Sequence, residues 1–233
     1  MGFIPIFLQV EGRPCLVVGG GEVARRKVET LLDAGAAVSV ISPELTDALA
    51  RQAEAGRISI AQRAYRDGDM ASYHLVYAAT GDRELQRRLF EEARRLNILI
   101  NVADSPEFCS FIVPSVLRRG RLQVAISTAG ASPATARVLR ERMEQWLGDE
   151  LEALVEVMAR ARDWLKRREP DASVRARKLA ALAAAEDLGR VLRAGDIDGV
   201  ERIAREYLGP DITLNDLVPD GRLPGIGAPV VKR

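Results

Sequence analysis

The chain has 233 residues, of which 47% are hydrophobic and 29% are charged, and its formal net charge is +1. This length is enough for one or two domains, each with a substantial core. A net charge so close to zero provides no overall attraction to nucleic acid or to an acidic membrane surface. We therefore expect neither as a partner.

The cysteines and the N-terminal residues indicate in which cellular compartment the protein is expected. Cys15 and Cys109 lie far apart and form no CxxC pair, which argues against a disulfide framework or a zinc site and fits a reducing cytoplasm. Residues 1–10 are apolar but have no basic leader or cleavage site, and Ile6 stands where a myristoylation signal needs Ser or Thr. No apolar run approaches the roughly 20 residues of a membrane-spanning helix. We expect a soluble, cytoplasmic protein.

Strands and helices alternate over the first half of the chain. Residues 14–18 predict a strand, residues 24–34 carry apolar side chains at helical spacing, and residues 37–41 predict a second strand, which together make a βαβ unit. The alternation continues with helices predicted at 45–55 and 84–96, and strands at 57–60, 75–79 and 98–102. Residues 1–112 are therefore predicted to form a doubly wound α/β domain with a parallel sheet.

The pattern changes after Pro114. Residues 121–127 predict one more strand, with alternate apolar side chains on one face. Ser132 and Pro133 then make a typical helix start, because serine caps a free N–H group and proline fits the first helical position.

From Ala134 onward the sequence is almost entirely helical. Breaks that predict three or four helices occur at Gly148, near Pro170 and at Gly195. The apolar stripes of these helices either pack within the chain or contribute to a dimer surface. Residues 209–233 contain four prolines and four glycines, so we expect a weakly ordered tail or an arm laid over the surface.

A glycine motif lies between the first strand and the first helix. Residues 19–24 read Gly-Gly-Gly-Glu-Val-Ala and match G-x-G-x-x-A. In such a motif Gly19 allows a tight turn, Gly21 lets the backbone approach a pyrophosphate, and Ala24 permits close packing of helix on strand. The phosphates would lie at the helix N-terminus. The alternative is a glycine turn that only reverses the chain, but the position within a βαβ unit favours a Rossmann-like nucleotide site.

The end of the second strand departs from the usual dinucleotide pattern. The acidic residue expected about 20 residues after the glycines to bind a ribose hydroxyl is absent, and Ser42-Pro43-Glu44 stands there instead. Ser42 or the backbone near Pro43 must substitute for it. No arginine at this strand end could hold a 2′-phosphate, so we expect NAD rather than NADP.

Six segments, taken together, resemble the precorrin-2 dehydrogenase/sirohydrochlorin ferrochelatase family, which is also found as the N-terminal half of bifunctional siroheme synthases. The resemblance covers about residues 3–145, and no motif matches beyond about residue 150. The segments, in chain order, are Pro5-Ile6-Phe7, Val18-Gly19-Gly20-Gly21, Ala78-Ala79-Thr80, Asn101-Val102-Ala103-Asp104, Phe111-Ile112-Val113-Pro114-Ser115 and Ser127-Thr128-Ala129-Gly130-Ala131-Ser132-Pro133.

The resemblance implies an activity and an organisation. The activity is oxidation of precorrin-2 to sirohydrochlorin with NAD as hydride acceptor, and in many members insertion of ferrous iron to give siroheme. The organisation is a homodimer, with a Rossmann domain at residues 1–112, a dimerisation and substrate region at 113–145, a helical C-terminal domain at 146–208 and the Pro/Gly-rich tail at 209–233. We expect another protein to carry out the methylation step of the bifunctional enzymes.

The glycine motif and the resemblance together give a set of candidate site residues. Ala129 stands where some members are expected to have glycine. The predicted cofactor site comprises Gly19, Gly21, Glu22, Val23, Ser42, Pro43, Glu44, Ala79 and Thr80, and the predicted substrate site comprises Asn101, Ser127, Thr128 and Gly130.

Asp104 is the predicted catalytic residue. It follows a strand that should end at the carboxyl edge of the sheet, where open α/β proteins bind ligands, and it matches the family's aspartate. A carboxylate there could accept a proton during dehydrogenation or take pyrrole protons during iron insertion, so no permanent metal site is required. The alternative is a turn aspartate that caps its own backbone.

Several arginines could bind the carboxylates of a tetrapyrrole, although each could equally be a solvated surface charge. These are Arg118, Arg119, Arg121, Arg137 and Arg140. Two functions other than the bifunctional enzyme stay open: a dehydrogenase without chelatase activity, and a non-catalytic NAD-sensing module whose helices bind a partner. The joint presence of Asp104 and the loop at 127–130 favours an enzyme.

Overall fold

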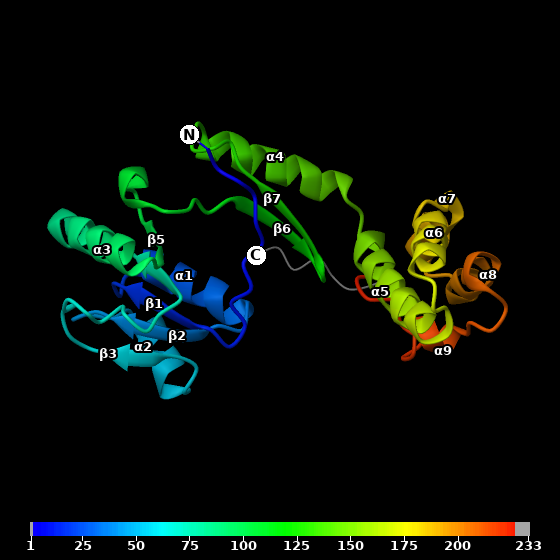
Figure 1. The fold of residues 1–233 in the computed structure, drawn as a ribbon, viewed down its shortest axis with the longest axis horizontal. Coiled ribbons are helices and arrows are strands. Elements are labelled where there is room, and N and C mark those ends of the chain that lie inside the picture. The colour runs from blue at the N-terminus through cyan, green and yellow to red at the C-terminus, as the bar shows by residue number, and fades with distance from the viewer. Residues whose placement is uncertain (1, 227–233) are drawn as a thin grey trace. The chain divides into compact units, whose positions relative to one another are not determined.

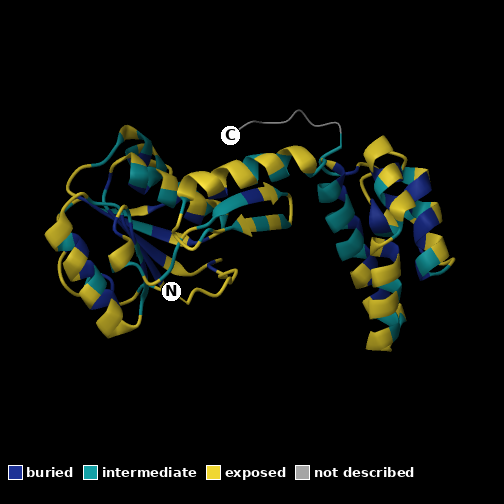
Figure 2. Ribbon diagram, turned by 90° about the horizontal axis from the view of Figure 1, so that it is seen from above, coloured by how far each residue is buried: buried dark blue, intermediate teal, exposed yellow. Residues whose placement is uncertain are grey.

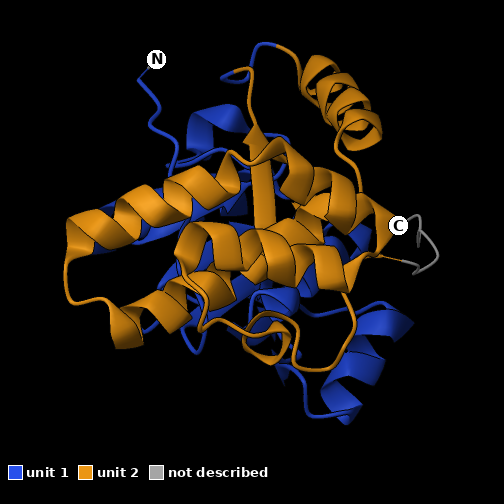
Figure 3. Cartoon of the chain, turned by 90° about the vertical axis from the view of Figure 1, so that its right-hand side faces the viewer, with its two compact units in different colours: residues 1–113, 129–131 blue, residues 114–128, 132–233 orange. Residues whose placement is uncertain are grey.

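The structure, a computed structural model, describes residues 2–226. The chain forms two compact units, Met1–Val113 with Ala129–Ala131 and Pro114–Thr128 with Ser132–Arg233 (Figure 3). The predicted end of the α/β domain at residue 112 therefore lies next to the observed boundary. The predicted region at 113–145 and the predicted helical domain at 146–208 belong almost entirely to one unit.

The first unit is built on a parallel sheet (Figure 1). Its strands are β1 (Pro14–Val18), β2 (Ala37–Ile41), β3 (Ser59–Ala61), β4 (Leu75–Ala78) and β5 (Leu99–Val102). The order is β3-β2-β1-β4-β5, so β1 pairs with both β2 and β4 and the order reverses there. Ligands of open parallel sheets bind beyond the carboxyl ends of the strands at such a reversal. The predicted Rossmann-like fold is confirmed.

Burial in this unit is concentrated on the sheet (Figure 2). All residues of β4 are buried, as expected for a parallel strand covered on both faces. The covering helices are α1 (Glu22–Asp33), α2 (Asp47–Glu54) and α3 (Arg83–Leu96), with a short 3-10 turn η1 (Pro106–Phe108) after β5. On α1, Ala24, Val28 and Leu31 are buried at four- and three-residue spacing, which is the pattern that predicted this helix.

The second unit begins with an antiparallel hairpin of β6 (Ser115–Arg119) and β7 (Leu122–Ile126). Gly120 in the connecting turn has φ +50°, a left-handed conformation that favours glycine. The sequence predicted only the second of these strands. Helix α4 (Pro133–Trp146) starts as predicted, because the Thr135 N–H donates to Ser132 Oγ at 3.2 Å.

Five more helices follow in the described part of the chain. They are α5 (Glu150–Arg168), α6 (Ala172–Ala183), α7 (Glu186–Ala194), α8 (Ile197–Leu208) and α9 (Leu214–Leu217). Breaks occur where they were predicted, but the prediction of three or four helices is too low, because it missed the breaks at residues 184–185 and 209–213. The apolar stripes of α5 to α8 pack into a core around Trp164, Leu182 and Leu192.

The segment after α8 is part of this core. Ile212, Leu217, Val218 and Leu223 are buried against the helices. Of the two alternatives predicted for this tail, weak order is therefore wrong for residues 209–226, and an arm laid over the helices describes them better. The sequence signal of prolines and glycines did not reveal these four apolar contacts. Residues 227–233 of the predicted tail lie outside the described residues. Among residues 2–226, no helix is long and apolar enough to cross a membrane.

Candidate functional site

The glycine loop follows β1 at the carboxyl edge of the sheet. Gly19 has φ +121°, and a Cβ atom there would lie 2.2 Å from the Ala79 carbonyl oxygen. A Cβ atom on Gly20 would lie 1.9 Å from the Glu44 carbonyl oxygen, whereas one on Gly21 would meet no atom within 4 Å. The first two glycines are therefore required by packing against the segments after β4 and β2, and Gly21 faces open space.

The N-terminus of α1 is open to an anion. Gly21 is its N-cap residue, and no side chain caps the first turn. The first helical hydrogen bond runs from Arg25 N–H to the Gly21 carbonyl at 3.0 Å, so the N–H groups of Glu22 and Val23 precede the helical ladder. The Glu22 side chain is exposed and accepts a hydrogen bond from Arg25 Nε at 2.8 Å. Glu22 and Val23 can thus bind a phosphate through their backbone N–H groups.

A cavity of about 630 Å³ opens beside this loop, a usual size for a small-molecule site. Seven of its residues were not singled out from the sequence, because only the fold brings them to the cavity: Leu45, Thr46, Ala64, Tyr65, Asp82, Leu85 and Arg88. Of the predicted cofactor residues, those that line it are Gly19, Gly21, Ser42, Pro43, Glu44, Ala79 and Thr80. The space at Gly21 and the uncapped helix fit the pyrophosphate of a dinucleotide.

The segment after β2 lines the cavity at the position where dinucleotide-binding folds usually have the acidic residue that binds the ribose. The buried Ser42 hydroxyl donates to the Glu44 carbonyl at 2.6 Å, so its proton is already engaged within the turn. The one arginine that lines the cavity is Arg88, and its guanidinium donates to Asp67 at 2.6 Å. The residues after β2 that line the cavity include no arginine.

Asp104 lies at the same edge of the sheet. Val102 pairs with Ala78, and the Ala103 N–H donates to the Ala78 carbonyl at 2.9 Å, so Asp104 follows β5 at the level where Thr80 follows β4. Asp104 is exposed and has φ +59°. Within the described residues its carboxylate makes no hydrogen bond or ion pair. The alternative in which this carboxylate caps its own turn is therefore not what the structure shows.

Two neighbours of Asp104 escaped the sequence analysis because no motif marks them. Lys27 of α1 is half-buried, and its Nζ lies 5.0 Å from the centre of the Tyr77 ring. Burial lowers the pKa of Lys27 and Arg26 lowers it further, while attraction to Cys109 and Asp104 opposes this shift. Gln86 of α3 is buried and contacts Ser105, the residue after Asp104.

Asn101, a predicted substrate residue, holds the chain after η1. Its Nδ2 donates to the Phe111 carbonyl at 3.0 Å and lies 3.5 Å from Cys109 Sγ. The side chain is half-buried. The visible role of this amide is to tie residues 109–111 to β5, and a role in substrate binding stays a prediction.

The loop before α4 carries the other predicted substrate residues. Ser127 and Gly130 are exposed, and the Thr128 hydroxyl both donates to the Ser132 carbonyl and accepts from the Ser132 N–H, each at 3.0 Å. Ala129 and Gly130 have φ +52° and +87°. Because left-handed backbone is unfavourable for alanine, the loop is strained where a glycine was expected. Ser127 and Thr128 belong to the second unit and Asp104 to the first.

Four of the five candidate arginines have carboxylate partners in the second unit. Arg118 is exposed and has no ion pair within residues 2–226. The pairs are Arg119 with Glu144 and Asp149, Arg121 with Glu156, Arg137 with Glu141, and Arg140 with Glu141 and Glu144. Arg118 is therefore the member of the set whose charge remains available to an anionic ligand.

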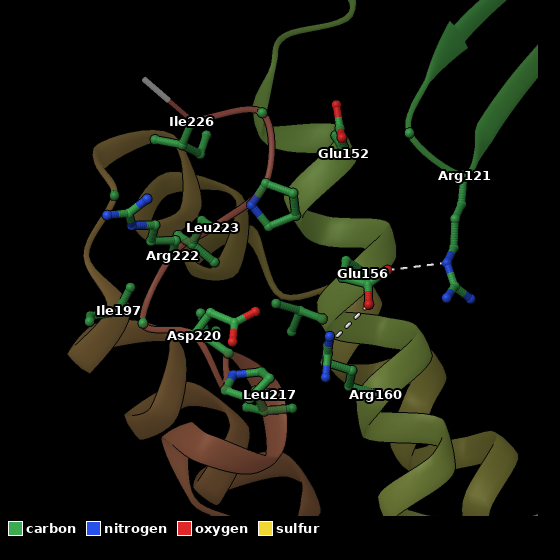
Figure 4. A pocket seen from close by; sticks show the side chains of 18 residues that line it. Arg121, Glu152, Glu156, Arg160, Ile197, Leu217, Asp220, Arg222, Leu223 and Ile226 are labelled. Atoms are coloured by element: carbon green, nitrogen blue, oxygen red, sulfur yellow. Dashed lines mark hydrogen bonds and ion pairs between the residues drawn. The ribbon is translucent and has the colours of Figure 1, made fainter. Parts of the chain in front are cut away.

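A larger cavity, of about 910 Å³, lies within the second unit between α5, the β6–β7 turn and residues 217–226 (Figure 4). Glu156 bridges two arginines across it, since Arg160 Nε donates at 3.0 Å and Arg121 Nε lies 3.2 Å away. Glu156 is thus neutralised by these two arginines, and no function is assigned to this cavity. Among the described residues, no group of three or more His, Cys, Asp or Glu could hold a metal ion.

Residues 6–115 match a family model for NAD(P)-binding, and residues 119–145 match one described as "Sirohaem biosynthesis protein central". The chain is 42% identical over 179 residues to siroheme synthase of Nitrosococcus oceani, and this alignment covers 77% of this chain and 38% of the relative. It is 44% identical over 168 residues to siroheme synthase of Methylobacillus flagellatus, and that alignment covers 72% of this chain and 36% of the relative. The chain thus spans less than half the length of these relatives.

A solved structure titled "SirC, precorrin-2 dehydrogenase" shares the fold. It superimposes with a TM-score of 0.70 at 23% identity and covers 87% of this chain and 100% of its own. The two family matches follow one another along the chain, and the sequence relatives extend across both. The chain is therefore similar to siroheme synthases over 72–77% of its own length.

Proposed function

We propose that the protein oxidises precorrin-2 to sirohydrochlorin with NAD in siroheme biosynthesis. The observation that carries this proposal is that an open glycine loop and the Asp104 carboxylate, which has no partner among residues 2–226, lie at the same edge of the sheet. The relatives named siroheme synthase and the fold neighbour titled precorrin-2 dehydrogenase support this substrate.

The glycine loop and the ends of β2 and β4 would hold the cofactor. Gly21 leaves room for the pyrophosphate, and the N–H groups at the start of α1 can bind its charge. Glu44 and the absence of an arginine after β2 favour NAD over NADP, because a 2′-phosphate needs a cationic partner there. When bound, NAD supplies a hydride acceptor. Gly19, Ser42, Pro43, Ala79 and Thr80 would form the walls around it.

Asp104 would accept the proton released in the oxidation. As a C–H bond of the substrate breaks and its electron pair leaves as hydride, an N–H or C–H proton moves to a carboxylate oxygen of Asp104, and a double bond forms in the macrocycle. The carboxylate is exposed and without a protein partner among residues 2–226. It can therefore contact a substrate without first breaking a hydrogen bond.

The same carboxylate supports ferrous iron insertion as a second activity. Metal entry into sirohydrochlorin displaces pyrrole N–H protons, and Asp104 can accept them in turn. Iron would act as a substrate in this reaction. The side chains proposed to contact the tetrapyrrole are Asn101, Ser127, Thr128 and Gly130, with Arg118 available for a peripheral carboxylate.

We also propose that the chain forms a homodimer through residues 113–145 and the helices that follow. A two-stranded hairpin is only marginally stable alone, and in β6, β7 and α4 only Leu117 and Ala136 are buried apolar residues. On α4, Val138 is 45%, Leu139 41% and Trp146 81% exposed. A second copy would cover these side chains.

The proposed compartment is the cytoplasm. Cys15 and Cys109 are not bonded to each other, which fits a reducing compartment. NAD as the oxidant is also available there.

The test is an anaerobic assay of the purified chain with precorrin-2 and NAD. We expect NADH absorbance and the spectrum of sirohydrochlorin to rise together, NADP to be a poorer acceptor, and added ferrous iron to convert the product to siroheme. A chain that binds NAD and leaves precorrin-2 unchanged would contradict the proposal and favour a non-catalytic NAD sensor. Oxidation without iron insertion would limit the protein to the dehydrogenase.

A further inference from the structure

Two consecutive hydrogen bonds connect the segments that follow β5 and β4. Ser105 Oγ donates to Gln86 Oε1 at 2.8 Å, and Gln86 Nε2 donates to the Thr80 carbonyl at 2.6 Å. Ser105 is 2% exposed and Gln86 6%. The three residues come from the segments after β5 and β4 and from α3, so one amide connects two loops that are far apart in sequence.

The direction of these hydrogen bonds follows from the groups involved. The Thr80 carbonyl can only accept, so the amide must present Nε2 to it. Oε1 then faces Ser105, whose hydroxyl must donate. The amide thus supplies the donor that the Thr80 carbonyl requires and an acceptor for the Ser105 hydroxyl.

Gln86 lies on the buried face of α3, where Leu89 and Ala93 follow it at three- and seven-residue spacing and are fully buried. The other buried polar side chain of this helix, Glu92, is likewise hydrogen-bonded, since it accepts from the Tyr65 hydroxyl and the Gly68 N–H. Burying an amide in such a position is unfavourable unless its polar atoms are bonded, so packing alone would favour leucine there. The amide is therefore explained by the connection that it makes.

This connection lies just beyond the last bond between β4 and β5. The direct ladder ends with Ala103 N–H on the Ala78 carbonyl, at 2.9 Å. Beyond this hydrogen bond, the segment after β4 continues to Thr80 and the segment after β5 continues to Asp104. The turn at Asp104 is closed by a long hydrogen bond, from Ser105 N–H to the Val102 carbonyl at 3.4 Å. Gln86 is the side chain that links this turn to the segment after β4.

We propose that Gln86 is a positioning residue that holds the Asp104 turn at a fixed place relative to the cofactor loop at Thr80. The inference rests on the proposed function, in which Asp104 takes a proton while a cofactor bound at Thr80 takes a hydride. A displacement of about 1 Å between reacting groups can cost about a hundredfold in rate. Loss of the link should therefore lower kcat and leave ligand affinities nearly unchanged.

The main test compares Gln86→Leu and Gln86→Glu with the wild-type chain in the anaerobic precorrin-2 assay. Gln86→Leu keeps the volume and removes both hydrogen bonds, so we expect kcat to fall about 10- to 100-fold at every pH. The KM for precorrin-2 and the Kd for NAD should stay within about threefold, since no group proposed to bind either ligand is removed.

Gln86→Glu provides a rescue that a purely structural role would not show. When protonated, the new carboxyl can donate to the Thr80 carbonyl and accept from Ser105, as the amide does. When ionised, it cannot donate. The ratio of variant to wild-type kcat should therefore approach one at low pH and fall at least tenfold as pH rises. The nearby carboxylates Asp82 and Asp104 are present in both proteins, so the ratio reports the effect of the new carboxyl at position 86.

Leu89→Val is the matched control, because it removes one methylene from the same buried face of α3, one turn away. It should lower the melting temperature without changing kcat. Amide hydrogen exchange at Ala103 and Ser105 should increase at least tenfold in Gln86→Leu and not in Leu89→Val, and this readout does not depend on turnover.

The outcomes separate the two proposals. A wild-type chain that does not oxidise precorrin-2 would reject the proposed function, and the exchange data would then decide the role of Gln86. An active wild-type chain with near-normal kcat in Gln86→Leu, or no pH-dependent recovery in Gln86→Glu, would overturn the positioning role. Unchanged exchange at Ala103 and Ser105 would overturn it as well.

Discussion

Replacing Gly21 with aspartate should stabilise the first unit and at the same time abolish NAD binding. Gly21 is the N-cap residue of α1, its φ of −85° suits any residue, and a Cβ atom there meets nothing within 4 Å. An aspartate side chain can therefore enter without a clash and accept hydrogen bonds from the free N–H groups of the first turn. Those N–H groups and that space are what the pyrophosphate would use.

The two effects have different magnitudes. Aspartate in place of glycine at an N-cap, together with the helix dipole, should contribute about 0.5–1 kcal/mol to stability, or a few degrees in Tm. Repulsion between two unit charges about 5 Å apart, at an effective dielectric constant of about 20, costs about 3 kcal/mol. This corresponds to roughly a 200-fold loss of affinity.

Thermal unfolding and NAD titration of Gly21→Asp measure the two effects separately. Gly21→Asn is the control, because it has the same shape, also caps helices well and lacks the charge. We expect Gly21→Asp to bind NAD much more weakly than Gly21→Asn, with the difference shrinking at high salt. Wild-type affinity in folded Gly21→Asp would show that the dinucleotide does not use this loop.

Three further predictions concern the carboxylate, the assembly and acid stability. Asp104→Ala should bind NAD normally while precorrin-2 oxidation falls about 10²- to 10⁴-fold, and near wild-type turnover would reduce Asp104 to a turn residue. Light scattering at micromolar concentration should give about twice the 25.5 kDa chain mass, and Leu139→Glu should halve it; an active wild-type monomer would reject the dimer. The hydrogen bond from Arg193 lowers the pKa of the largely buried Glu150, so this pair stabilises the fold above the ordinary carboxyl pKa of about 4.3 and loses its effect as pH falls through the lowered value. Arg193→Ala should therefore lower Tm at pH 7 and have a smaller effect near pH 3, and an equal effect at both would refute the linkage.

The sequence predicted several elements of both units well because their signals are local. The apolar spacing on α1, the glycines after β1 and the Ser132-Pro133 helix start each act over a few residues, and the structure has all three where they were expected. The position of Asp104 at the carboxyl edge also followed from sequence alone, since strand ends alternate with helices in a βαβ fold.

Tertiary structure decided the features that depend on partners distant in sequence. The sequence gives no reason for Gly20 to need its missing side chain, which would meet the Glu44 carbonyl, or for Gln86 to bridge Thr80 and Ser105. Composition likewise predicted weak order after α8, whereas Leu223 is buried against helices that begin up to 73 residues earlier. Periodicity and turn signals report the conformation of neighbouring residues, but burial and hydrogen-bond partners depend on which distant surfaces meet, and that is fixed only when the whole chain has folded.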